Sequence, residues 1–161
     1  MATPLRIPLK GATNISYVEA VKSTGIIMEC PCRLALKKGG KFWTLPLEPT
    51  ISIKASKTVV RRNIAKATGS GTVKEVFSLD DYEISIEGLL QGADDNFPEA
   101  DFSKLQSFLQ PLQNIVIQSR LTDLVGIDLI CVVDWEYPAT PGLENQAYQF
   151  TAYSDQYFDL T

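Results

Sequence analysis

The most regular pattern of apolar and polar residues in this chain lies at residues 82–90. Apolar and polar side chains alternate there, so that one face of an extended chain carries Tyr82, Ile84 and Ile86, and the other carries Glu83, Ser85 and Glu87. A repeat of two is typical of an antiparallel strand with one face on a core. The pattern therefore predicts a half-buried strand over residues 82–90.

Shorter runs of β-branched and aromatic residues predict further strands. They cover residues 26–36, 41–45, 50–54, 57–61, 72–77, 115–119, 127–135 and 148–153. Glycine, proline, serine and aspartate separate these runs and predict turns and loops, with long loops at 62–71 and 138–145. We expect the strands within residues 57–90 to form core scaffold and the two long loops to provide contact surfaces.

One helix is predicted over residues 98–110. Pro98 suits its first turn, acids cluster near its positive end, and apolar residues recur at helical spacing, namely Phe102, Leu105, Phe108 and Leu109. We expect this apolar stripe to pack on the core. The chain is therefore predicted to be α+β and mainly antiparallel β, built as a β-sandwich or barrel of about eight strands with one flanking helix at about 98–110.

The domain organisation follows from composition. Residues 1–25 mix proline, glycine, threonine and asparagine with short apolar stretches and predict an N-terminal arm, which leaves residues 26–161 as a single β-rich domain. Hydrophobic residues at 45% and charged residues at 21% are usual for a globular domain. No apolar run approaches the roughly 18 residues of a membrane span, and the N-terminus lacks a secretory signal. We therefore expect a protein made in a cytoplasm, with no membrane partner.

The formal net charge of −4 hides an uneven distribution. Residues 1–74 hold 13 Lys and Arg against three Glu, a net charge of +10, whereas residues 75–161 hold two basic residues against 16 acids, a net charge of −14. Opposite halves can neutralise one another within one fold or attract each other between copies of the chain. The sequence leaves both arrangements open.

Candidate catalytic groups are few. The chain has no histidine, which excludes Ser/His, Cys/His and His–metal sites. Paired carboxylates remain, but each pair lies in or beside a predicted turn, where solvated acids are usual: Asp80 with Asp81, Asp94 with Asp95, and Asp134 with Glu136. Cys30, Cys32 and Cys131 lack the number and spacing of a zinc site. We therefore predict no enzyme, no cofactor and no metal.

A basic stretch at residues 54–74 supports an alternative function. Six basic residues occur there without an intervening acid: Lys54, Lys57, Arg61, Arg62, Lys66 and Lys74. Such a stretch is typical of phosphate contact and makes a nucleic-acid-binding module the alternative. The stretch contains no aromatic residue, however, and the predicted helix is acidic. Contact between this stretch and an acidic surface of a neighbouring subunit is therefore favoured.

Several segments also resemble a known family. The segments at 45–53 (LPLEPTISI), 57–61 (KTVVR), 71–75 (GTVKE) and 81–88 (DYEISIEG) are similar to small uncharacterised proteins from phages and prophages of Bacteroidetes-type bacteria. The similarity continues to residue 158. It implies a structural component of a phage tail, in or near the tail tube or baseplate hub, with a tail-tube-like fold and no catalytic residues.

The same resemblance implies partners and a location. The partners would be copies of the chain in a ring and other tail or baseplate proteins, with DNA met only as it passes through a tube lumen. The location would be the virion, after synthesis in the bacterial host cytoplasm. A ring requires unlike faces on each copy. With the charge distribution, this predicts a subunit interface in which Arg61, Arg62 and Lys66 meet Asp80, Asp81, Asp94 and Asp95 of a neighbour.

Overall fold

Strands dominate the computed structural model, which describes residues 28, 30–63, 71–93 and 95–156. In chain order the elements are β1 (Cys32–Ala35), β2 (Trp43–Thr44), β3 (Thr50–Lys54), β4 (Lys57–Arg62), β5 (Val73–Leu79), β6 (Glu83–Gln91), α2 (Glu99–Leu109), β7 (Ile115–Ser119), α3 (Arg120–Val125), β8 (Leu129–Glu136) and β9 (Asn145–Asp155). Seven strands form one antiparallel sheet in the order β2-β1-β7-β8-β9-β6-β3. The remaining two, β4 and β5, form a separate hairpin.

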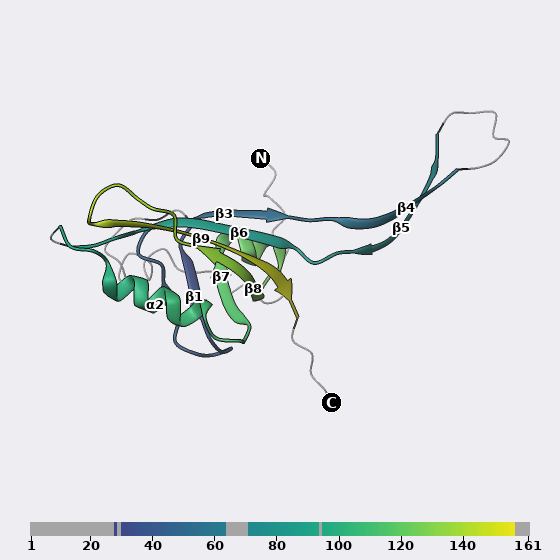
Figure 1. The fold of residues 1–161 in the computed structure, drawn as a ribbon. Coiled ribbons are helices and arrows are strands. Elements are labelled where there is room, and N and C mark those ends of the chain that lie inside the picture. Colours follow the sequence, from purple (N-terminus) through teal and green to yellow (C-terminus); the bar gives the residue numbers. More distant parts are fainter. Residues whose placement is uncertain (1–27, 29, 64–70, 94, 157–161) are drawn as a thin grey trace, which may run out of the picture.

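β8 joins the two halves of the sheet. Only its first residues pair with β7, as Ile130 does with Ile115, whereas its whole length pairs with β9. The register with β9 shifts between Val132 and Asp134, and such a bulge bends a strand. β1 and β7 therefore run across beneath β6 and β9, and the sheet curls around one core (Figure 1). Within the described residues its edge strands, β2 and β3, are not hydrogen-bonded to each other.

The inner face of the curled sheet is buried, as the alternating pattern predicts. Ile84 and Ile86 of β6 are fully buried, and so is Phe150 of β9. The same cluster takes residues from β1, β7, β8 and α2, namely Cys32, Leu34, Ile115, Ile117, Ile130, Leu105, Phe108 and Leu109. The prediction of a mainly antiparallel β fold with a flanking helix is confirmed.

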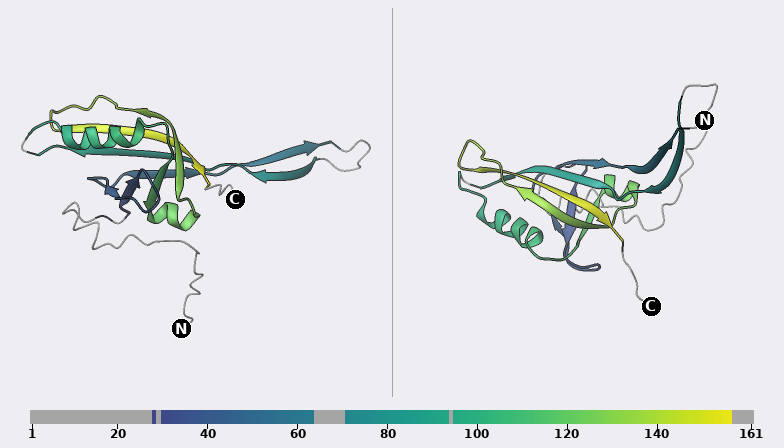
Figure 2. Two further views of the ribbon diagram at one scale, coloured as in Figure 1. Left: turned by 90° about the horizontal axis from the view of Figure 1, so that it is seen from below. Right: turned by 45° about the vertical axis from the view of Figure 1, so that its right-hand side comes forward.

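α2 covers the core from beneath β6 and β9 (Figure 2). Its apolar stripe packs inward, and the Phe108 ring stacks on that of Trp43 with 5.6 Å between ring centroids. The helix begins at Glu99, one residue later than predicted, and acids occupy its first turn as expected. Within the described residues, no helix is long and apolar enough to cross a membrane.

The sequence pattern misses a second helix, α3. The N–H of Ser119 donates to Thr122 Oγ1 over 3.0 Å at its start, and Gly126, with φ of 84°, ends it by donating to the carbonyl of Thr122. These are the capping signals of a helix, and they stand in the sequence as Ser119, Thr122 and Gly126. Six residues are too few to show a helical period, which is why the pattern misses α3.

Some strand boundaries differ from the predictions. The strand predicted over 26–36 begins only at Cys32 within the described residues, and Pro31 just before it has no N–H to donate to a ladder. β9 is longer than predicted and takes up Asn145, the last residue of the predicted loop at 138–145. The predicted arm at 1–25 lies outside the described residues, so it stays a prediction.

Close packing between β6 and β9 centres on Gly88. This residue lies directly opposite Tyr148. A Cβ added to Gly88 would overlap the Tyr148 hydroxyl and lie 2.5 Å from ring carbon Cζ. The Tyr148 side chain is 2% exposed, so the surrounding core leaves it no room to move aside. Glycine therefore allows the tyrosine ring to lie over the strand.

Replacing Gly88 should destabilise the fold through this overlap. We expect Gly88→Ala to lower the free energy of unfolding by about 1–3 kcal/mol, the usual cost of overpacking a core. The matched control is Glu87→Ala, on the exposed side of the same strand, which should change it by less than about 0.5 kcal/mol. Urea denaturation measures both variants. Equal changes in the free energy of unfolding for the two variants would contradict the close packing of Gly88 against Tyr148.

Candidate functional site

The most distinctive feature of the molecule is a projecting β-hairpin. β3 continues into β4, and β5 continues into β6, so two strands of the sheet extend together beyond it (Figures 1 and 2). We call the paired strands β4 and β5 the arm. At about 3.3 Å per residue, the paired part of the arm is roughly 20 Å long. The arm therefore presents two strand faces and two strand edges away from the body.

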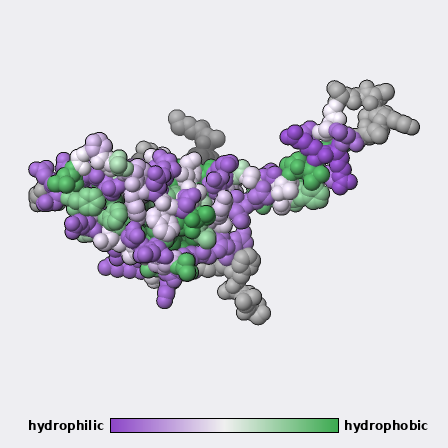
Figure 3. All heavy atoms as spheres, viewed as in Figure 1, coloured by the Kyte–Doolittle hydropathy of each residue, from purple (hydrophilic) through white to green (hydrophobic). Residues whose placement is uncertain are grey.

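The arm exposes apolar side chains. Every residue of β4 is exposed, and Val76, Phe77 and Leu79 of β5 are 62%, 63% and 55% exposed. Figure 3 shows these strands as an apolar group bordered by hydrophilic residues. The expectation that all strands within residues 57–90 form core scaffold is therefore wrong for β4 and β5 and right for β6. Consecutive valines such as Val59 and Val60 point to opposite faces, so the arm has no single apolar face to bury.

Strand register assigns the arm residues to two faces. Residues directly opposite each other in an antiparallel pair share a face. One face, which we call the cationic face, combines three apolar and three basic side chains and no acid: Lys57, Val59, Arg61, Lys74, Val76 and Leu79. The other face carries Glu75, whose carboxylate pairs with Arg62 across 3.1 Å. Charge is thus neutralised on one face and left positive on the other.

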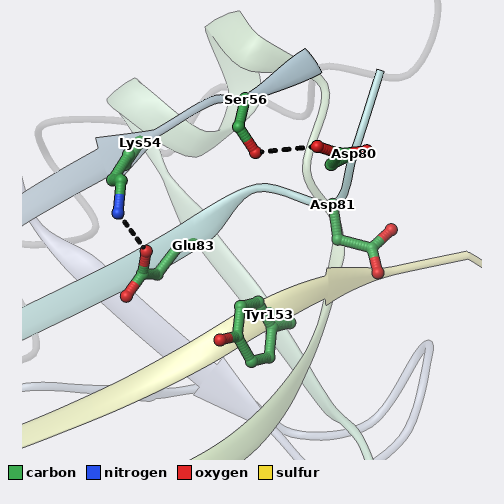
Figure 4. A pocket seen from close by; sticks show the side chains of 6 residues that line it. All are labelled: Lys54, Ser56, Asp80, Asp81, Glu83 and Tyr153. Carbon is green, nitrogen blue, oxygen red and sulfur yellow. Dashed lines mark hydrogen bonds and ion pairs between the residues drawn. The ribbon is translucent and has the colours of Figure 1, made fainter. Parts of the chain in front are cut away.

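The base of the arm is held by Asp80. Its carboxylate accepts a hydrogen bond from the Ser56 hydroxyl at 3.1 Å (Figure 4). It accepts another from the Thr58 hydroxyl at 2.8 Å, and the Asp80 N–H donates to the Ser56 carbonyl. These contacts join the chain entering the arm to the chain leaving it. Asp80 therefore fixes the direction of the arm within its own subunit.

A polar pocket of about 380 Å³ lies at this base. Lys54 and Glu83 form an ion pair of 2.9 Å on one side, and this hydrogen bond and the charge of Glu83 raise the pKa of Lys54. The Asp81 carboxylate points away from Glu83 (Figure 4), so the acids do not converge on one point as acid–base chemistry requires. Among the described residues, no group of His, Cys, Asp and Glu could hold a metal ion.

A second pocket, of about 660 Å³, lies at the opposite end of the sheet. We call it the distal pocket. It lies between the end of β6, the start of α2 and the loop before β9, and its lining includes Gln91, Asn96, Phe97, Glu99, Asp101 and Leu143. Leu143 is 69% exposed, and Phe97 is 38% exposed. This pocket combines apolar surface with two carboxylates.

The predicted interface residues fall in different places. Arg61 and Arg62 lie side by side on the arm, on opposite faces, while Asp80 is engaged in its own subunit. Asp95 lies exposed in the loop beside the distal pocket, with a left-handed φ of 57°. Lys66 and Asp94 lie outside the described residues. The structure therefore separates the basic and acidic members of the predicted set, and their contact across subunits stays a prediction.

Sequence reasoning missed the distal pocket and the role of Asp80. The pocket brings together segments distant in sequence, and only the exposed apolar residues Phe97 and Leu143 beside acids could have signalled it. The predicted contact loop at 138–145 does border it through Leu143. The three cysteines differ in exposure: Cys32 is buried in β1, where burial raises the pKa of its thiol, Cys30 is half-buried, and Cys131 is exposed on β8.

One buried acid stands apart from these surfaces. Asp123 of α3 is 8% exposed, and its Oδ2 accepts no hydrogen bond from the described part of the chain. Burial, the largest cause, and the charge of neighbouring Asp128 together raise its pKa from 3.8 to about 6, and Arg33 opposes the shift. Asp123 lies in a helix packed beside β7, away from any pocket described above, so we assign it a structural effect only.

Removing the Asp80 carboxylate should loosen the arm without unfolding the body. In Asp80→Ala both hydroxyls at the base lose their acceptor, so we expect backbone amides of β4 and β5 to exchange at least several-fold faster. Amides of β6 and β9 should exchange as in the parent protein. The control, Asp81→Ala, lacks these hydrogen bonds and should leave the arm unchanged. Hydrogen exchange read by mass spectrometry tests this, and equal exchange in both variants would contradict it.

The raised pKa of Asp123 predicts a defined pH dependence. Between about pH 4 and pH 6 the folded state binds the Asp123 proton more tightly than the unfolded state, so this group's contribution to stability falls as pH rises through that window. We expect Asp123→Asn to have a higher Tm than the parent at pH 7 and a similar Tm near pH 4. Asp134→Asn, at an exposed position of β8, is the control. A Tm difference that does not change with pH would contradict the prediction.

Comparison with known proteins gives one family and several matching chains of solved structures. No curated protein matches the chain. Among solved structures, a chain described as "Tail of empty GTA particle computed with helical refinement, C6 symmetry" shares 15% identity over 81% of this chain and 94% of its own length, with a TM-score of 0.43. A likeness at that level identifies no shared function.

The family match runs from Thr44, the last residue of β2, to the end of the chain. A family model described as "Domain of unknown function (DUF6046)" matches residues 44–161, which include the arm, the distal pocket and most of the core. The Bacteroidetes-type origin implied by the sequence resemblance stays a prediction. Since the match spans most of its length, this chain belongs to the family of the domain of unknown function DUF6046.

Proposed function

We propose that this protein is a structural subunit that assembles with copies of itself through the arm. The observation that carries the proposal is the exposure of Val76, Phe77 and Leu79 on strands that project from the body. Exposed apolar side chains that are grouped on one projecting element mark an interaction site. The described body leaves the arm uncovered, because the arm points away from it, and a second copy would supply the missing cover.

The setting we propose is a phage-like tail, in a tube or baseplate hub, within a virion. The sequence resemblance supports this setting, and the family match over residues 44–161 includes the segments that carry it. A subunit with a projecting arm at one end and unlike surfaces at the other suits a head-to-tail contact, which produces a ring when it closes. In this role the protein acts by contact and performs no catalysis.

A nucleic-acid-binding module is the second candidate. A two-stranded ribbon fits the major groove of DNA, and the arm carries Lys57, Arg61, Arg62 and Lys74 against the single acid Glu75. The exposed apolar side chains argue against it, because phosphate contact gives them no partner. Weak DNA binding that weakens steeply with salt would favour this candidate.

Removing apolar side chains from the arm should prevent assembly. We expect the parent to form discrete oligomers by native mass spectrometry and electron microscopy. Val76→Ser with Leu79→Ser should weaken each contact about ten-fold per side chain, from ~1.5 kcal/mol of lost burial each, with an unchanged Tm. Leu112→Ser, which removes a fully exposed leucine from the loop after α2, is the control and should assemble. A parent that stays monomeric at every concentration would refute the proposal.

A further inference from the structure

The arm and the distal pocket lie at opposite ends of one strand. β6 leaves the arm at Glu83 and reaches the distal pocket at Gln91 (Figure 1). Eight residue steps at about 3.4 Å separate these ends by roughly 27 Å. Since the arm also points away from the body, it cannot enter the distal pocket of its own chain. Any contact between these two surfaces must join two copies.

The distal pocket is acidic. Glu99 and Asp101 line it, and they more than offset the positive end of the α2 dipole. No Lys or Arg occurs in the sequence between residues 75 and 103 or between 121 and 161, and every segment that lines the pocket comes from these stretches. The pocket therefore attracts a cationic partner and repels the phosphates of nucleic acid.

The cationic face of the arm has the complementary chemistry. It places Arg61 and Lys74 opposite each other, with no acid on that face. Val76 lies next to them opposite Val59, and Leu79 lies nearer the base opposite Lys57. The distal pocket offers carboxylates to the cations and the exposed side chains of Phe97 and Leu143 to the apolar residues. A pocket of about 660 Å³ lies in the size range of ligand sites and has room for several side chains from one ribbon face.

We propose that the cationic face of the arm docks into the distal pocket of a second copy of this chain. This inference rests on the proposed function, and it names the receptor of the arm, which the proposed function leaves open. Each copy then donates an arm at one end and accepts one at the other. Such a contact is heterologous, so it builds a ring if the rotation between copies closes and a filament if it does not.

The test reverses charge on each surface separately. The arm variant is Arg61→Glu with Lys74→Glu, and the pocket variant is Glu99→Lys with Asp101→Lys. Alone, each variant opposes like charges at every contact, so we expect oligomer formation to need at least ten-fold more protein than in the parent. An equal mixture of the two should assemble, because the negative arm of one fits the positive pocket of the other. Native mass spectrometry should then show oligomers that contain equal numbers of the arm variant and the pocket variant.

Matched controls separate pocket contact from net charge and from misfolding. Asp134→Lys with Glu136→Lys makes the same charge change as the pocket variant, at two exposed positions of β8, and should assemble like the parent. Thermal unfolding of every variant checks that the body remains folded. Restored assembly in the mixture could not come from a variant that fails to fold.

The outcomes distinguish this inference from the proposed function. If the arm variant loses assembly while the pocket variant assembles like the parent, the pocket is not the receptor and the proposed function stands. If both lose assembly and the mixture does not restore it, the direct pairing is wrong. If the β8 control loses assembly as much as the pocket variant, the proposed pairing is also wrong, because the change in net charge would then be the cause. A parent that never assembles would refute both proposals.

Discussion

The pairing of β6 with β9 is the constraint on which the rest of the structure depends. Nine residue pairs, from Glu83 with Tyr153 to Gln91 with Asn145, hold the two strands together. β3 extends the sheet from β6, β8 extends it from β9, and α2 covers the core that their inner faces form. The Tyr148 ring over Gly88 packs this ladder closely, so a single added methyl group would disturb both strands.

The same ladder sets the distance between the arm and the distal pocket, the two surfaces of the proposed contact. Because β6 is fixed along its length, the arm that enters at one end and the distal pocket that begins at the other keep a constant separation. A protein that assembles through unlike surfaces needs such a rigid spacer, since the rotation between copies decides whether a ring closes. Asp80 continues this rigidity into the arm by joining its two strands at the base.

An exposed two-stranded arm can cause aggregation as well as provide a contact surface. Unpaired strand edges can hydrogen-bond to other chains, and exposed valines favour aggregation. Proteins commonly protect such edges with basic side chains, which repel a second copy. Lys57, Arg61 and Lys74 do this on the cationic face of the arm. The basic residues would thus have two roles in the proposed assembly, keeping free subunits apart and directing the arm toward an acidic surface.

Local pattern determined much of this fold. The sequence alone predicts the bounds of β3 and β7 as the structure has them, the alternation of β6 and β9, and the inward stripe of α2, because each depends on neighbours within a few residues. It also shows the charge division and the absence of histidine. Burial, however, is not local: β4 and β6 have similar β-forming composition, but only β6 has β9 and α2 against it.

Only the tertiary structure decided where the two charged surfaces lie. The sequence places the basic stretch and the acidic loop about 30 residues apart, a spacing that would allow them to meet within one chain. Pairing along β6 turns that spacing into a rigid separation, so the arm and the distal pocket face in different directions. The sequence determined which side chains each surface carries, and the hydrogen-bonded ladder determined that the two surfaces can meet only between copies.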